Sequence, residues 1–84
     1  MALTTLNLKH SRARLTEMFL KHIEEEVAKE AINIATSKLG IASNWFDREQ
    51  ALQILDYMSQ NSDKAGLIAR LLKVRVRLDW DNLA

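Results

Sequence analysis

The segment Asn7–Gly40 decides the fold, and it reads NLKHSRARLTEMFLKHIEEEVAKEAINIATSKLG. Apolar residues occupy every fourth position of its central part, namely Leu15, Phe19, Ile23, Val27, Ala31, Ala35 and Leu39. At about 100° per residue, each step of four advances the apolar position by roughly 40°, so the series winds around a helix. The spacing therefore predicts one helix of about 30 residues, roughly 45 Å long, with different apolar faces in its two halves.

A helix of this length exceeds what an 84-residue chain needs, and the rest of the sequence supplies only two shorter helices to cover it. We therefore expect a second copy or another protein to cover part of the winding apolar surface. The predicted protein interface consists of Leu15, Phe19, Ile23, Val27 and Ile34. The alternative is that the helix breaks near Asn33 or Thr36 and folds back on its own chain.

Several residues mark where helices begin and end. Asn7 or Ser11 is expected to cap the start of the long helix, and Gly40 is expected to end it in the left-handed conformation. Asp47 with Gln50 matches a capping box, which predicts a second helix from residue 48 to about residue 60.

The third predicted helix begins after Ser62 or Asp63. Its apolar positions cover more than half of its circumference, which predicts that it is the more buried of the two shorter helices. These positions are Leu67, Ile68, Leu71, Leu72, Val74, Val76 and Leu78. From Val74 to Leu78 apolar residues also alternate with arginines, so an extended edge strand remains an alternative to helix there.

Three large aromatic residues lie outside these helices. Trp45 and Phe46 are expected to fill the corner between the first two helices, with exposure of Trp45 for recognition as the alternative. Trp80 is expected to fold back onto the body of the domain, although a terminal aromatic can also serve as a docking peptide.

Composition favours a single all-α domain over residues 1–84, with a flexible arm at 1–6 and a tail at 79–84. The chain contains no Cys and no Pro and only two Gly, which disfavours disulfides and a turn-rich β fold. We expect a small helical bundle of one long and two shorter helices, completed by dimerisation. No apolar run approaches the roughly 18 residues of a membrane span, so we expect no membrane partner and a cytoplasmic location.

The sequence offers no constellation for catalysis. His10 and His22 are twelve residues apart, and although Glu25 and Glu26 follow His22 at helical spacing, such pairs are usually surface interactions. No Gly-rich phosphate loop or nucleophile motif occurs. We therefore expect no enzymatic activity, no catalytic or metal-binding residues and no cofactor.

The predicted function is a protein–protein interaction module that acts in assembly, scaffolding or regulation, as a homodimer. The alternative is a small helical nucleic-acid-binding regulator that uses Arg70, Lys73 and Arg77 on one face of the third helix, aided by the basic cluster near the N-terminus. The net charge of +1 and the apolar character of that helix weigh against the alternative.

Overall fold

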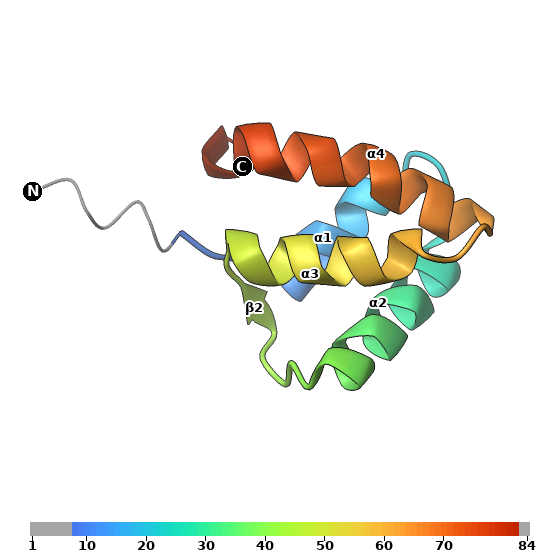
Figure 1. Cartoon of the computed structure of the whole chain (residues 1–84), viewed down its shortest axis with the longest axis horizontal. Helices are drawn as coiled ribbons and strands as arrows, with labels where there is room; N and C mark the ends of the chain where they lie inside the picture. The colour runs from blue at the N-terminus through green and yellow to red at the C-terminus, as the bar shows by residue number, and fades with distance from the viewer. Residues whose placement is uncertain (1–7, 83–84) are drawn as a thin grey trace, which may run out of the picture.

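The computed structural model describes residues 8–82 and confirms the all-α fold class. Figure 1 shows helices α3 and α4 side by side, with α1 and α2 packed across them. The helices are α1 (Arg12–Phe19), α2 (Glu25–Leu39), α3 (Arg48–Ser59) and α4 (Lys64–Asp79), followed by the 3₁₀ turn η2 (Trp80–Asn82). The predicted arm at 1–6 and the candidate cap Asn7 lie outside the described residues.

The prediction of one long N-terminal helix is wrong, because the chain turns between Phe19 and Glu25. The backbone N–H of Ile23 still bonds to the Phe19 carbonyl at 3.0 Å, but Glu24 is extended, with ψ of 152°. The run Glu24–Glu26 accounts for the position of this turn. Carboxylates are favourable beside the positive N-terminal end of a helix, so the acidic run suits a helix start better than a helix middle. Neither Asn33 nor Thr36, the predicted places for a break, interrupts α2.

The predicted helix ends are otherwise confirmed. Ser11 accepts a hydrogen bond from the Arg14 N–H, and Gly40 ends α2 with φ of 74°. Asp47 and Gln50 form the complete reciprocal capping box at the start of α3. Asp63 caps α4 by accepting from the Gly66 N–H at 2.9 Å.

A two-residue antiparallel ladder, which the sequence did not predict, holds the start of α1 against the link between α2 and α3. Strand β1 (His10–Ser11) pairs with β2 (Trp45–Phe46), with His10 opposite Phe46. Phe46 enters the core, as expected, but Trp45 points outward and is 56% exposed. The corner is therefore filled by Phe46 alone.

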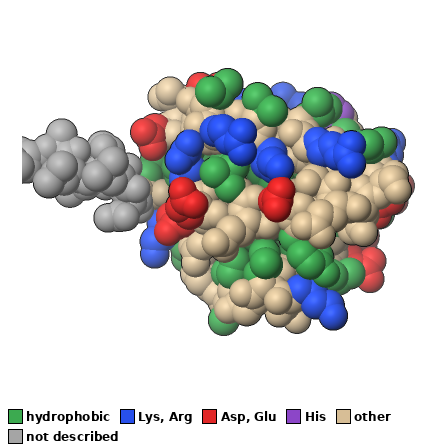
Figure 2. Space-filling view, viewed as in Figure 1, with side chains coloured by type: hydrophobic (Ala, Val, Ile, Leu, Met, Phe, Trp, Pro, Cys, Tyr) green, Lys and Arg blue, Asp and Glu red, His purple; other side chains and the backbone are tan. Residues whose placement is uncertain are grey.

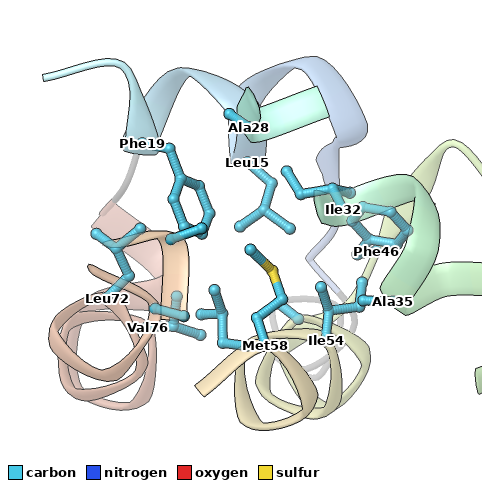
Figure 3. Close-up of a cluster of buried hydrophobic side chains, with 14 of the residues drawn as sticks. Leu15, Phe19, Ala28, Ile32, Ala35, Phe46, Ile54, Met58, Leu72 and Val76 are labelled. Atoms are coloured by element: carbon cyan, nitrogen blue, oxygen red, sulfur yellow. The ribbon is translucent and has the colours of Figure 1, made fainter. Parts of the chain in front are cut away.

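The core lies between all four helices, and Figure 3 shows its side chains converging on one cluster. Its largest fully buried members are Phe19, Phe46, Leu15, Ile32, Ile54, Leu55 and Val76. Trp80 is also buried, which confirms that the C-terminal aromatic folds back onto the domain. No helix among residues 8–82 combines the length and apolar content needed to cross a bilayer.

Candidate interaction surface

Helix α4 carries a row of large aliphatic side chains on its outer side. We call the row the α4 stripe; its members and exposed fractions are Leu67 (49%), Leu71 (65%), Val74 (55%) and Leu78 (75%). The helix continues unbroken to Asp79, so the strand alternative for residues 74–78 is wrong. The prediction that this helix is the more buried of the shorter two is also wrong, because α4 lies at an edge of the bundle and only one side of it meets the core.

The geometry of the α4 stripe is that of a helix-packing seam. Its members are spaced by four, three and four residues, the spacing of the a and d positions of a coiled coil. At 100° per residue they fall within an arc of about 60°. The residues that α4 buries in the core are Ala65, Ala69, Leu72 and Val76, which lie on the opposite side of the helix. The α4 stripe is therefore an apolar face that residues 8–82 leave uncovered.

Cations surround the α4 stripe. Helix α4 contains Lys64, Arg70, Lys73, Arg75 and Arg77, and its single acid is Asp79 at the last position. In Figure 2 hydrophobic side chains lie among Lys and Arg side chains along the upper part of the molecule, where α4 runs. Such a face favours an apolar partner surface with negative charge at its rim.

Arg70, Lys73 and Arg77, the residues predicted to contact nucleic acid, all lie on α4. Two of them bind other residues of the domain through their side chains. Lys73 forms an ion pair with Asp56 of α3 at 2.8 Å, and Arg70 donates from Nε to the Ser59 carbonyl at 3.3 Å. Among residues 8–82, neither Arg75 nor Arg77 uses its side chain in a hydrogen bond or ion pair. Their guanidinium groups flank the α4 stripe on opposite sides.

The five residues of the predicted interface separate into two groups. Leu15 and Phe19 are buried and point into the core cluster, so they are core residues and are not accessible to a partner. Ile23 is half-buried and packs against the same core. Val27 and Ile34 are 45% and 49% exposed on α2. Only these last two therefore offer apolar surface to a partner.

Val27 and Ile34 belong to a smaller apolar surface, which we call the α2 patch. Val27, the half-buried Ala31 and Ile34 follow a spacing of four and three, and the exposed Glu26 and Glu30 lie beside them. Among the described residues, neither of these two glutamates has a side-chain hydrogen bond or ion pair, whereas Glu25 pairs with Lys29 at 3.2 Å. The α2 patch thus repeats the spacing of the α4 stripe, with acids beside its first half and Lys38 at its C-terminal end.

Arg12 makes the densest polar cluster of the domain. Its guanidinium lies 5.3 Å from the centroid of the Phe46 ring. It donates to Asn44 Oδ1 (3.2 Å), Asn33 Oδ1 (2.9 Å), Thr36 Oγ1 (3.1 Å) and the Ser43 carbonyl (3.1 Å). The cluster ties α1 to the second half of α2 and to the segment before β2.

An open pocket of about 570 Å³ lies beside Arg12 and is also lined by Trp45, Glu25 and Lys29. Protein acceptors already take four of the five guanidinium N–H groups of Arg12. No buried side-chain N or O atom within residues 8–82 lacks a hydrogen-bond partner. The buried polar groups around the pocket are therefore already paired within the domain.

The described part of the chain brings together no group of three or more His, Cys, Asp or Glu residues able to hold a metal ion. His22 and Glu25 line an open hollow at the turn between α1 and α2, whose other charged members are Lys21, Glu24 and Lys64. Glu26 lines a separate hollow along α2. His10 instead contacts Trp80, with its Nε2 donating to the Trp80 carbonyl at 3.0 Å.

Fold and surface together define a small all-α domain whose last helix presents an apolar, cation-flanked face. No protein-family model, curated protein or solved structure matches this chain.

Proposed function

We propose that this protein is a non-enzymatic interaction module that acts in assembly, scaffolding or regulation by associating with further copies of itself. The observation that carries the proposal is the α4 stripe, four large aliphatic residues at seam spacing that are each about half exposed or more. Monomeric domains commonly expose single apolar residues, whereas a contiguous apolar row with a polar rim is typical of protein-binding surfaces.

The size of the surface sets the expected strength of association. Full burial of a Val or Leu side chain contributes about 1.5–3 kcal/mol. Each side chain of the α4 stripe is already partly buried within the domain, so its further burial on association contributes less than this. Association costs at least about 4 kcal/mol in lost translational and rotational freedom. We therefore expect weak, concentration-dependent self-association, not a permanent dimer.

The test is sedimentation velocity over a wide range of protein concentration. The wild-type chain is expected to increase in average mass with concentration, and the variant Leu71→Gln/Val74→Gln to remain monomeric. Gln is a good helix former and both positions are exposed, so the variant should fold normally, which circular dichroism and thermal unfolding check.

The matched control is Trp45→Gln, which removes an exposed apolar side chain of larger size away from α4. It is expected to associate as the wild type does. A wild-type chain that stays monomeric at high concentration, or a Leu71→Gln/Val74→Gln variant that associates as well as the wild type, would overturn the proposal.

The nucleic-acid alternative stays a prediction. It depends on Arg70, Lys73 and Arg77 acting together, and two of these three side chains already have partners within the domain. This observation favours the interaction module.

A further inference from the structure

We infer that the α4 stripe of one copy packs antiparallel against the α2 patch of the next copy, so that the chain assembles head to tail. This inference rests on the proposed function and identifies which surface of the second copy covers the α4 stripe. It follows from the shapes, charges and positions of the two surfaces.

The shapes match because both surfaces follow the same helical seam. Val27, Ala31 and Ile34 repeat the spacing of four and three that the α4 stripe shows from Leu67 to Val74. Two helices whose exposed apolar residues recur at this spacing pack side by side with interlocking side chains. Ala31 is small, which gives a large aliphatic residue of the other helix room to approach.

Opposite charges meet when the α4 stripe of one copy faces the first half of the α2 patch of another. Pairing two α4 stripes would bring Arg75 and Arg77 of both copies to one contact, and the only acid that each α4 helix contributes is Asp79. The α2 patch instead offers Glu26 and Glu30, and both lack partners among residues 8–82. Like charges facing one another at an interface disfavour association, whereas opposite charges fix the pairing.

Charge also selects the antiparallel direction. The acids of the α2 segment lie in its first half, at Glu24–Glu26 and Glu30, and Lys38 lies in its last turn. Arg75 and Arg77 lie in the second half of α4. Antiparallel packing places these opposite charges side by side and also aligns the helix dipoles favourably. Parallel packing would place Lys38 beside the arginines.

One antiparallel register places Leu78 of one copy against Val27 of the next. In this register Glu30 and Arg77 occupy equivalent positions beside the seam. Both are g positions when the apolar rows are taken as a and d, and g positions face one another across an antiparallel pair. Arg77 uses only its backbone carbonyl within the domain, where it accepts a hydrogen bond from Arg48 at 3.0 Å. Its guanidinium is therefore available to the neighbouring copy.

The two surfaces belong to different helices and differ in residues. The α2 patch borders the start of α4, where Ala31 and Ile34 share a small hollow with Ala65 and Gly66. The α4 stripe lies on the outer side of α4, away from the residues that this helix buries in the core. A contact between two different surfaces of identical chains repeats from copy to copy unless a ring closes. We therefore expect oligomers that grow beyond the dimer as concentration rises.

The experiment is a charge-swap cycle followed by sedimentation velocity. Arg77→Glu and Glu30→Arg, tested separately, are each expected to weaken self-association about tenfold, because each places like charges across the contact. The double variant Glu30→Arg/Arg77→Glu, with the wild-type net charge, is expected to recover association to within about twofold. Lys9→Glu and Glu49→Arg are the matched controls, since each makes the same charge change at an exposed residue outside both surfaces.

Other outcomes separate this inference from the proposed function. If Leu71→Gln/Val74→Gln dissociates the oligomer but Glu30→Arg has no effect, the α4 stripe pairs with another surface and the head-to-tail inference fails alone. An average mass that stops increasing at two copies, or a double variant that does not recover, also overturns it. A monomeric wild type that sediments with vesicles of anionic phospholipid would assign the α4 stripe to a membrane surface and overturn both proposals.

Discussion

The indole Nε1 of Trp80 donates a hydrogen bond of 2.8 Å to the backbone carbonyl oxygen of Leu8, which joins residues 72 positions apart. The same indole meets the His10 ring edge to face, with the ring centroids 4.4 Å apart. Because Trp80 is also buried, the first and last described segments of the chain are held to each other and to the core. Trp80 is therefore structural, and its use as a docking peptide would require this contact to break.

Replacement of Trp80 tests this arrangement. Trp80→Ala is expected to lower the free energy of unfolding by about 3–5 kcal/mol, because it leaves a cavity and removes the aromatic contact. Trp80→Phe keeps most of the packing and loses the hydrogen bond, for a cost of about 1 kcal/mol. Urea denaturation measures both. Equal stability of the Ala variant and the wild type would show that the ends of the chain do not contribute to the fold.

The two glycines are expected to respond differently to alanine. At Gly66 a Cβ atom would overlap the backbone carbonyl oxygen of Asn61, in the turn that joins α3 to α4. It would also lie 2.8 Å from the backbone carbonyl oxygen of Met58, in the last turn of α3. Gly66→Ala should therefore cost about 1–3 kcal/mol or more, as overpacking does. Gly40→Ala meets no atom within 4 Å but requires φ of 74°, and should cost about 1–2 kcal/mol. Thermal unfolding distinguishes the two, and the reverse order would contradict the close approach of α4 to this turn.

Arg12 is expected to be sensitive even to a conservative change. Arg12→Lys keeps the charge but loses the planar fork that reaches Asn33, Thr36 and Asn44 at once. We expect a loss of about 2 kcal/mol in the free energy of unfolding. Arg75→Lys is the matched control, since the Arg75 side chain is exposed and makes no hydrogen bond or ion pair among residues 8–82. Similar stabilities of the two variants would show that the Arg12 cluster is not structural.

The nucleic-acid alternative predicts a salt-dependent affinity. We expect filter binding with double-stranded DNA or single-stranded RNA to detect no complex even at low salt, because Lys73 and Arg70 are engaged within the domain. Real phosphate contacts would instead give an affinity that falls steeply as salt increases. If such binding appears and Arg77→Ala weakens it, the basic face of α4 is a nucleic-acid surface.

The signals that predicted the fold correctly are local. Gly40, Asp47 and Asp63 act within a few residues of their own position, and the structure uses each as the sequence predicts. The missed turn after Phe19 was also signalled locally, by the run Glu24–Glu26. The period-four apolar series obscured this signal, because it continues through the turn as if the helix were unbroken. In the structure Phe19 and Ala28 both reach one core, which they can do only because the chain changes direction between them.

The interaction surface was harder to predict because exposure depends on where a helix lies in the bundle. Apolar residues on most of a helix's circumference are expected for a fully buried helix. They are also found on an edge helix that carries a second, exposed apolar face, and periodicity alone does not distinguish the two cases. Leu71 and Leu72 show the difficulty, since adjacent leucines lie on the outer and inner sides of α4. The Arg12 cluster and the β1–β2 ladder had no detectable signal, because their partners are distant in sequence.

The outer and inner residues of α4 are separate sets. Leu72 and Val76 hold the helix to the domain, while Leu67, Leu71, Val74 and Leu78 take no part in the buried core. Substitutions on the outer side can therefore alter solubility and the choice of binding partner while the melting temperature stays nearly constant. A designer could exchange the outer residues of this single helix to redirect the domain to a new target without redesigning its interior.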